Sequence, residues 1–317
     1  MGRVMRSTSD YGVEFESFVK AQKIQVGDDG NLLTVDTGWL DVGHVDEIVC
    51  FVPKPGGYAV LVPSPLRAVD IMHGLEVAGN GDAQMRMGTQ GTGTLTKTVE
   101  ETLVRNVGGV VQITTLAAPV SAEAQVFSLT APRFADGDLL RVDNEYVTVL
   151  SGGGTATITV ARADWGPPAT PHAAGAKIYA LTDLCVYNIS NYPTVSGGEP
   201  GPQLRIDALV TKLEKDLDLS PGALDVRKVP VLFVRVAPGV YSEYTSDVVN
   251  CLVAGGLAIL RKTHGPQKAG TDYFEADTAT RFAGLSVSPV FIDAWSLHMQ
   301  LGEVHCGSNA VREPLTS

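Results

Sequence analysis

The middle of the chain carries a sequence pattern that differs from the pattern on either side of it. Between residues 111 and 183, short runs rich in β-branched residues alternate with clusters of Gly, Pro, Asp and Ala at short spacing. This spacing is typical of a small all-β sandwich or barrel, because each run makes one strand and each cluster makes one turn. We therefore expect an inserted β-rich domain over residues 111–183, between two segments, 1–110 and 184–317, that fold together.

Outside this region the patterns of strands and helices alternate, which is typical of an α/β fold. A β-hairpin is expected where the apolar residues 47–52 and 58–62 flank a Pro- and Gly-rich turn. Apolar residues at helical spacing predict an amphipathic helix over residues 206–217 and a further helix over 274–283. Between residues 67 and 106 the pattern is weaker and predicts only one helix, near residues 96–104.

Two further segments, one near the start of the chain and one after the β-rich region, also have recognisable patterns. Residues 11–24 show apolar residues at helical spacing, and residues 191–202 are rich in Pro, Gly and Ser. We expect the first segment to be a helix and the second a linker.

The charge of the chain excludes one broad class of function. The 317 residues include 24 Lys and Arg against 35 Asp and Glu, so the formal net charge is −11. Proteins that bind nucleic acids by neutralising phosphates expose a net basic surface, so we expect no nucleic-acid partner. No apolar run approaches the roughly 20 residues of a membrane span, and the first ten residues lack the apolar core of a signal peptide. We expect a cytoplasmic protein.

The four cysteines, Cys50, Cys185, Cys251 and Cys306, lack the close spacing of zinc sites or redox pairs. The simplest expectation is that three are buried and one is free. Cys306 nevertheless lies in a polar segment near the end of the chain, and His44 lies in another near the beginning. One Cys and one His far apart in sequence suit a thiol nucleophile with an acid/base partner, although a single His before a strand is more often structural.

Four segments resemble the protein-arginine deiminase family, in the family's order. Leu40–Pro53, with its Gly-His-Val-Asp-Glu run, resembles the family's His-containing motif, and Phe291–Pro314, with Gly-Glu-Val-His-Cys-Gly-Ser-Asn, resembles its nucleophile motif. Leu217–Phe233 and Asp247–Asn250 resemble the segments between them. The resemblance covers residues 1–110 and 184–317 and leaves out the β-rich region. It implies a pentein-like α/β-propeller, here partial, with a central substrate pocket.

The resemblance also implies an activity and roles for residues. The family hydrolyses peptidyl-arginine to citrulline and ammonia through a covalent thiouronium. By resemblance Cys306 is the nucleophile, His44 the acid/base, and Asp46 the carboxylate that holds the guanidinium. Asn250 is a candidate substrate contact, with a structural hydrogen-bonding role as the alternative. Gln300 is the other candidate substrate contact, at the position where vertebrate members place an arginine at the pocket mouth, and this difference puts recognition of the peptide backbone in doubt.

Some family features have no counterpart here. The family's second guanidinium-binding Asp and most of its calcium ligands lie upstream of the matching region, and nothing in residues 1–41 resembles them. Calcium is therefore expected by resemblance only. The chain would be the C-terminal part of a larger protein or of a split gene, or a degenerate homologue. Within the matching region, Glu47 is expected only to begin a strand, and His305 to point away from Cys306 and be structural, since alternate residues of a strand face opposite sides.

The β-rich region leaves a separate question open. It resembles small β modules of phage tail and baseplate proteins, and we expect it either to bind another protein or to space the two flanking segments. Its acidic residues Asp136, Asp138, Asp143 and Glu145 are candidate calcium ligands, although acidic residues of turns are usually solvated.

Two other functions stay open at this stage. One is a non-catalytic, phage-associated interaction protein on a pentein scaffold. The other is a deiminase of free arginine or agmatine. The sequence does not distinguish peptide from free arginine, nor does it give calcium dependence, oligomeric state or the role of the insert.

Overall fold

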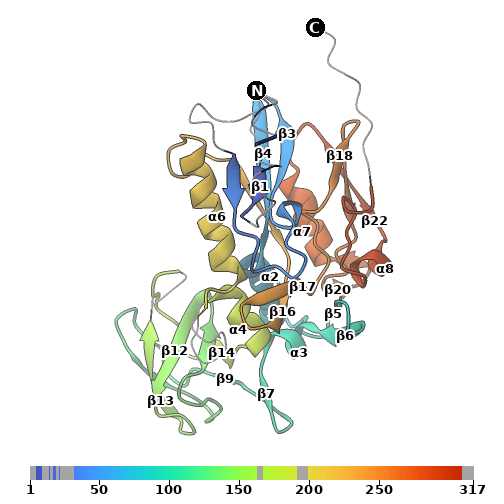
Figure 1. Cartoon of the computed structure of the whole chain (residues 1–317). Helices are drawn as coiled ribbons and strands as arrows, with labels where there is room; N and C mark the ends of the chain where they lie inside the picture. Colours follow the sequence, from blue (N-terminus) through green and yellow to red (C-terminus); the bar gives the residue numbers. More distant parts are fainter. Residues whose placement is uncertain are drawn as a thin grey trace. The chain divides into compact units, whose positions relative to one another are not determined.

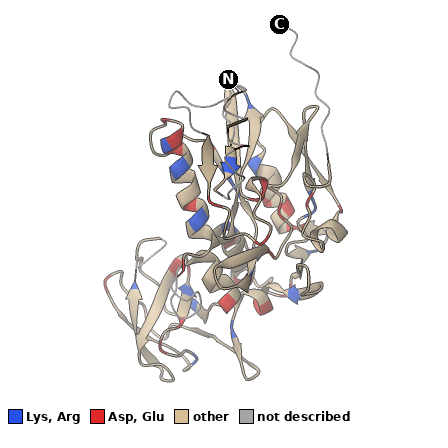
Figure 2. Cartoon of the chain, viewed as in Figure 1, with Lys and Arg blue, Asp and Glu red and all other residues tan. Residues whose placement is uncertain are grey.

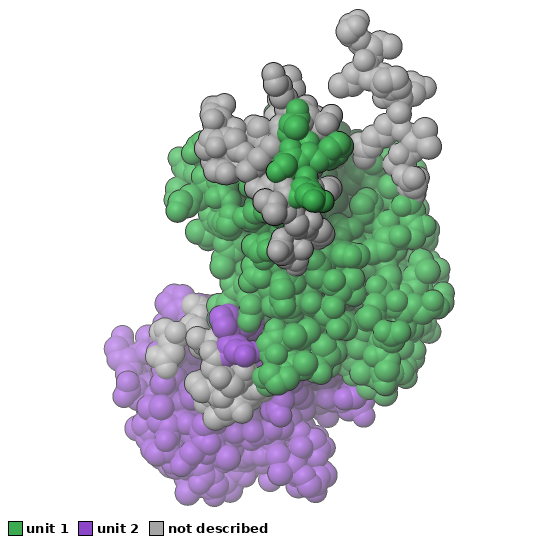
Figure 3. Space-filling model, in the orientation of Figure 1, with its two compact units in different colours: residues 1–68, 86–96, 202–317 green, residues 69–85, 97–201 purple. Residues whose placement is uncertain are grey.

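The computed structural model describes residues 5–8, 14, 17–18, 21, 32–162, 167–190 and 199–308. The helix expected over residues 11–24 and most of the linker expected over 191–202 lie outside these residues. The chain forms two compact units, one of residues 1–68, 86–96 and 202–317 and one of residues 69–85 and 97–201 (Figure 3). Both contain helices and strands, so the mixed α/β class expected from the sequence is confirmed.

A three-stranded sheet of order β15-β4-β3 lies at the centre of the first unit. Strands β3 (Cys50–Lys54) and β4 (Gly57–Ser64) are antiparallel, which confirms the predicted hairpin. Its turn is short because Gly56, at φ +77°, adopts a left-handed conformation that favours glycine. Strand β15 (Val226–Pro230) pairs in parallel with β4, whose residues from Ala59 onward are buried.

Two helices flank this sheet (Figure 1): α6 (Pro202–Asp216) contacts β4, and α7 (Tyr273–Arg281) contacts β15. Both helices confirm predictions. The apolar stripe of α6 is buried through Ile206, Leu209 and Leu213, while its charged residues, apart from the buried Glu214, lie on the rest of the helix (Figure 2). The packing of this stripe on the sheet stabilises a helix that would be marginal alone.

The remaining elements of the first unit carry the candidate site. Its hairpins are β16 (Phe233–Ala237) with β17 (Val240–Glu243), and β18 (Leu252–Ala254) with β19 (Leu257–Arg261), and β22 (Ser288–Ile292) joins β19 in parallel. Its short elements are β1 (Met5–Ser7), β2 (Leu33–Val35), the 3-10 turn η1 (Val45–Glu47), β20 (Gln267–Lys268), β21 (Thr271–Asp272) and α8 (Trp295–His298).

Residues 65–106 contain more regular structure than the sequence indicated. Helix α2 (Pro65–Val77), β5 (Gln84–Met87) and β6 (Leu95–Thr98) precede α3 (Val99–Leu103), and only α3 was predicted. Thr98 caps α3 by accepting a hydrogen bond from the backbone N–H of Glu101. Helix α2 was missed because apolar residues occur on more than one of its faces, so it shows little periodicity.

The second unit contains a six-stranded antiparallel sheet of order β10-β13-β12-β11-β14-β9. The edge strands β9 and β10 also meet, through a bridge between Leu116 and Leu129 and a hydrogen bond from the N–H of Thr130 to the carbonyl of Thr115. The sheet therefore closes on itself as a small barrel. The strands are β9 (Ile113–Thr115), β10 (Val126–Ser128), β11 (Leu139–Val142), β12 (Glu145–Ser151), β13 (Thr157–Arg162) and β14 (Lys177–Ala180).

A continuous apolar core fills this barrel, with Phe127, Leu140, Val142, Val160 and Ile178 fully buried. The hairpin of β7 (Asn106–Val107) and β8 (Val110–Val111) precedes it, and helix α4 (Asp183–Ile189) follows it. The sequence boundaries 1–110, 111–183 and 184–317 stay a prediction.

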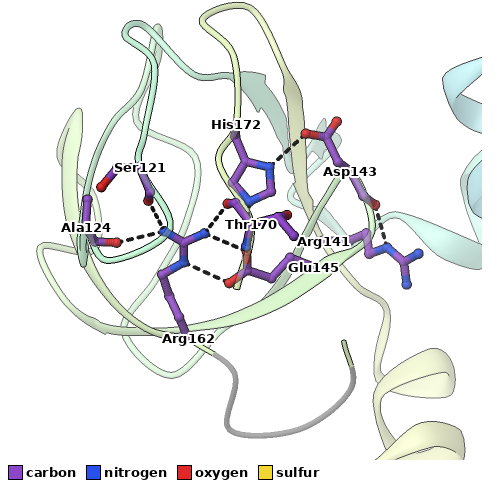
Figure 4. Close-up of polar contacts among 8 residues, drawn as sticks. All are labelled: Ser121, Ala124, Arg141, Asp143, Glu145, Arg162, Thr170 and His172. Atoms are coloured by element: carbon purple, nitrogen blue, oxygen red, sulfur yellow. Dashed lines mark hydrogen bonds and ion pairs between the residues drawn. The ribbon is translucent and has the colours of Figure 1, made fainter. Parts of the chain in front are cut away.

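A buried network of hydrogen bonds and ion pairs stabilises one side of the barrel (Figure 4). The guanidinium of Arg162 donates to both carboxylate oxygens of Glu145, at 2.8 and 2.6 Å. His172 lies between Glu145, at 2.9 Å, and Asp143, at 2.8 Å. Burial alone would raise the pKa of Glu145, but the hydrogen bonds from Arg162, Thr170 and His172 lower it below its ordinary value.

Asp136 and Asp138 are also bonded to protein groups. Asp136 accepts a hydrogen bond from the N–H of Gly153, and Asp138 pairs with Arg105. Of the four acidic residues considered as calcium ligands, Asp138 and Glu145 are buried, while Asp136 and Asp143 are exposed.

No helix within the described residues is both long enough and apolar enough to cross a membrane.

Candidate active site

His44 and Asp46 lie on a short turn that leads into the central sheet. Leu40 pairs with Tyr241, and Gly43, at φ +83°, turns the chain into η1. The carboxylate of Glu47 accepts a hydrogen bond from the backbone N–H of His44 at 2.6 Å, which closes this turn. Glu47 therefore ends a 3-10 turn and is buried, so the expectation that it only begins a strand was wrong.

Cys306 lies in a turn rather than a strand, and its thiol is exposed. The buried side chain of Asn250 holds this turn: its Oδ1 accepts from the N–H groups of His305, at 2.9 Å, and Cys306, at 3.3 Å. Its Nδ2 donates to the sulfur of Cys306 at 3.3 Å. Asn250 is thus a direct partner of the candidate nucleophile, which corresponds to the hydrogen-bonding alternative for this residue.

The two candidate segments meet through an ion pair. Nδ1 of His305 lies 2.6 Å from Oδ2 of Asp46, although the residues are 259 positions apart in the sequence. The expectation that His305 and Cys306 face opposite sides assumed a strand. It was wrong, because residues 304–307 form a turn, in which side chains do not alternate between two faces. The carboxylate assigned to the substrate cation is occupied by an imidazole in this conformation.

Cys306 lines a narrow pocket behind this turn. The space inside it is about 10 Å³ for the centre of a water-sized sphere, which is close to the room that one water needs. A planar guanidinium therefore requires side chains to move. The residues that line the pocket are Val42, Glu47, Thr89, Glu243, His298, Leu301, Glu303 and Cys306.

His44 and Gln300 stand apart from this pocket's lining. The side chain of His44 is 56% exposed and lies 4.0 Å from the carboxylate of Glu47. Within the described part of the chain, no hydrogen bond joins His44 to Cys306. Gln300 is exposed at the end of the α8 segment. The structure thus joins Asp46, Asn250 and Cys306 through direct contacts and the His305 bridge, and leaves His44 and Gln300 outside that set.

Two buried carboxyl groups, those of Glu47 and Glu243, line the pocket. Burial, followed by the charge of Glu243, raises the pKa of Glu47 far above its ordinary value. Burial also raises the pKa values of Glu243 and of Asp247. Oε2 of Glu47 and Oε1 of Glu243 are buried and have no hydrogen-bond donor among the described residues, which disfavours ionisation of both carboxyl groups at once.

A second buried cluster supports the turn that carries Cys306. Glu303 lies 2.9 Å from Nδ1 of His298 and 2.5 Å from Nη1 of Arg261. The other ring nitrogen of His298 donates to the carbonyl of Gly88 at 2.6 Å. Sequence reasoning missed Glu243, His298 and Arg261, because isolated charged residues in apolar segments carry no signal of which partners will bury them.

The family resemblance raised calcium as a cofactor. Within the described ranges, no group of three or more His, Cys, Asp or Glu side chains is arranged to hold a metal ion.

A model of the family described as protein-arginine deiminase matches residues 1–113 and 201–317. These ranges cover more than half of the chain. The chain belongs to the protein-arginine deiminase family. The match leaves out residues 114–200, which include most of the barrel.

Individual family members are distant from this chain. It is similar to protein-arginine deiminase type-1 of Mus musculus, at 35% identity over 106 residues, or 33% of the chain and 15% of the relative. Type-3 of Homo sapiens is 24% identical over 302 residues, which cover 94% of the chain and 31% of the relative. Type-4 of Rattus norvegicus is 22% identical over 325 residues, covering 99% and 35%. The chain spans about a third or less of the length of these relatives.

Proposed function

We propose that this chain carries the nucleophile-bearing part of a protein-arginine deiminase, a hydrolase that converts peptidyl-arginine to citrulline and ammonia. Cys306 attacks, His44 transfers protons, and Asp46 holds the guanidinium. Family membership supports the reaction class. The assignment of these three residues rests on contacts between segments that are remote in sequence. Asp46 contacts His305, and Asn250 contacts Cys306.

The guanidinium is planar and permanently protonated, so it needs an anionic partner and a strong nucleophile. Asp46 binds it through parallel N–H···O bonds. The thiolate of Cys306 attacks the guanidinium carbon, and the hydrogen bond from Asn250 stabilises charge on the sulfur. His44, as the imidazolium, protonates the departing nitrogen, so ammonia leaves as the C–N bond breaks and a thiouronium remains.

The second half of the reaction uses water. Neutral His44 takes a proton from a water molecule as its oxygen attacks the thiouronium carbon. The C–S bond then breaks, which restores the thiolate, and the remaining hydroxyl proton passes to solvent, which leaves the neutral ureido group of citrulline. The side chain loses one positive charge, so Asp46 no longer has a cationic partner and the product is released.

Substrate entry in this proposal displaces His305. The guanidinium and the imidazole of His305 require the same carboxylate, and the pocket beside Cys306 has room for about one water. When the guanidinium takes over Asp46, His305 moves away and the pocket widens. The exposed side chain of His44 also moves toward the reacting carbon.

We further infer that the family-matching segments form a partial pentein-like propeller and that residues 111–183 are an insert within it. The gap in the family match, at residues 114–200, supports the insertion. The barrel then binds another protein or spaces the flanking segments.

The test is citrulline production from an arginine-containing peptide, by the wild type and by Cys306→Ala, with and without calcium. Citrulline from the wild type alone supports the proposal. If free arginine and the peptide react at equal rates, the substrate is the free amino acid rather than peptidyl-arginine. Absence of citrulline from folded protein under all conditions would leave the non-catalytic scaffold as the function.

A further inference from the structure

Two cysteines that are remote in sequence lie side by side in the first unit. The sulfur atoms of Cys50 and Cys251 are 3.6 Å apart, across 201 positions of sequence, and both thiols are free. Cys50 begins β3, and Cys251 directly precedes β18. A disulfide bond requires about 2.05 Å between the sulfurs, so the pair needs to close by about 1.5 Å.

The two thiols differ in access to solvent. Cys50 is half-buried, whereas Cys251 is only 4% exposed. The hydrogen bond with Cys50, and then burial, raise the pKa of Cys251 well above its ordinary value. An oxidant in solution therefore reaches Cys50 first, and Cys251 is placed to react with whatever forms there.

The pair adjoins both halves of the candidate active site. Cys50 follows Glu47 by three residues, and Cys251 is the direct neighbour of Asn250, which holds the Cys306 turn. A bond between the two cysteines therefore ties the segment that carries Asp46 to the segment that positions the candidate nucleophile.

We propose that Cys50 and Cys251 form a site of oxidative modification, a dithiol that peroxides convert to an intramolecular disulfide. The Cys50 thiolate attacks one peroxide oxygen, so the O–O bond breaks and Cys50 becomes a sulfenic acid. The Cys251 thiol then attacks the Cys50 sulfur, which forms the S–S bond and breaks the S–O bond. Each sulfur loses one electron, and hydrogen peroxide is reduced to two molecules of water.

Formation of this disulfide has two consequences. The disulfide links positions 201 residues apart and restricts the unfolded chain, so the thermal unfolding midpoint rises by several degrees. It also displaces the backbone beside Asn250, so the alkylation rate of Cys306 changes by more than about twofold. This inference does not depend on the proposed catalysis.

The experiment treats the full chain carrying Cys306→Ser with hydrogen peroxide, because Cys306 is exposed and would itself react. The expected mass loss is about 2 Da, for two hydrogens, with a linked peptide pair containing Cys50 and Cys251 on non-reducing digestion. Cys185, which is fully buried, serves as the internal control and stays reduced. In the matched Cys251→Ser variant, the sulfenic acid at Cys50 persists and reacts with dimedone.

Two results would overturn the proposal. They are over-oxidation of Cys50 while Cys251 can still be alkylated, and a disulfide between two copies of the chain. A linked pair with an unchanged unfolding midpoint would contradict the expected stabilisation. The coupling to the active site is measured with Cys306 intact, after treatment with an equimolar small disulfide and removal of residual reagent, and Cys251→Ser protein treated in the same way corrects for direct reaction of Cys306, which is exposed. An alkylation rate of Cys306 that is the same in oxidised and reduced protein excludes the coupling.

Discussion

Asp46 binds the imidazole of His305, although the proposed substrate cation requires the same carboxylate. The imidazole and the guanidinium therefore compete for one carboxylate, and removal of the imidazole favours the substrate. His305→Ala is expected to lower KM for an arginine peptide several-fold, while Asp46→Asn raises KM and reduces kcat/KM by about 100-fold. Steady-state kinetics of both variants checks this prediction. A His305→Ala variant with a raised KM would show that His305 helps to bind the substrate.

Asn250 donates a hydrogen bond to the sulfur of Cys306, the proposed nucleophile. Asn250→Asp keeps the shape and the acceptor for the two backbone N–H groups, but it replaces the donor to sulfur by a negative charge. The variant is expected to lose about 10²–10³ in kcat with a smaller change in KM, because the charge disfavours the thiolate. The pH dependence of Cys306 alkylation provides a second readout, and it should move to higher pH. An unchanged alkylation profile would contradict the role given to Asn250.

The raised pKa of the Glu47 and Glu243 pair has a consequence for stability. The folded state keeps a proton that the unfolded chain releases above the ordinary value near 4.5. The stability from this proton is fully present below that value and is lost as the pH rises toward the raised value. The amide introduced by Glu243→Gln cannot ionise. Between pH 5 and pH 9 the unfolding free energy of this variant should therefore fall by less than that of the wild type, with a difference of about 1 kcal/mol or more.

Urea unfolding at the two pH values measures this difference. Asp41→Asn is the matched control, since Asp41 is an exposed acid of the same segment and should leave the pH dependence unchanged. A Glu243→Gln variant that loses as much stability as the wild type would mean that the pair is ionised in the folded protein.

At the scale of elements, the barrel depends on the polar network around Glu145. Glu145→Ala leaves the guanidinium of Arg162 and the ring of His172 buried without their shared acceptor. The expected cost is about 3–5 kcal/mol of unfolding free energy, the usual range for one partner lost from a buried ion pair. Denaturant unfolding followed by circular dichroism measures it. Glu123→Ala, at an exposed position of the same unit, should cost less than about 0.5 kcal/mol.

The elements that sequence reasoning predicted are those with a strong local signal. Helix α6 has one apolar stripe, and the β3-β4 hairpin has Pro and Gly between two apolar runs. Helix α2 lacks a single stripe, and α4 is only seven residues long, so neither produced a periodic pattern. Closure of the barrel between β9 and β10 was also beyond local reasoning, because it depends on pairing across the whole sheet.

At the scale of the whole molecule, the candidate site depends on contacts between segments that are remote in sequence. The motifs around His44 and Cys306 predicted which residues react, because those residue types and their surroundings resemble a family, and these roles stay a prediction. They did not indicate that His305 contacts Asp46, or that burial raises the pKa values of Glu47 and Glu243, since both depend on how separate elements pack. The pairing of Cys50 with Cys251 was likewise unpredictable: two of the four thiols are buried rather than three, and the spacing of 201 residues carries no signal.

The most direct measurement is the mass of an arginine peptide after incubation with this chain in ¹⁸O-labelled water. Attack of water on a thiouronium at Cys306 predicts a gain of about 3 Da, because the nitrogen that leaves is replaced by a labelled oxygen. The gain should be absent with Cys306→Ser, and reduced by at least about 100-fold in rate with His44→Ala. No mass gain with the folded wild-type chain, or an equal gain with Cys306→Ser, would contradict the proposed catalysis.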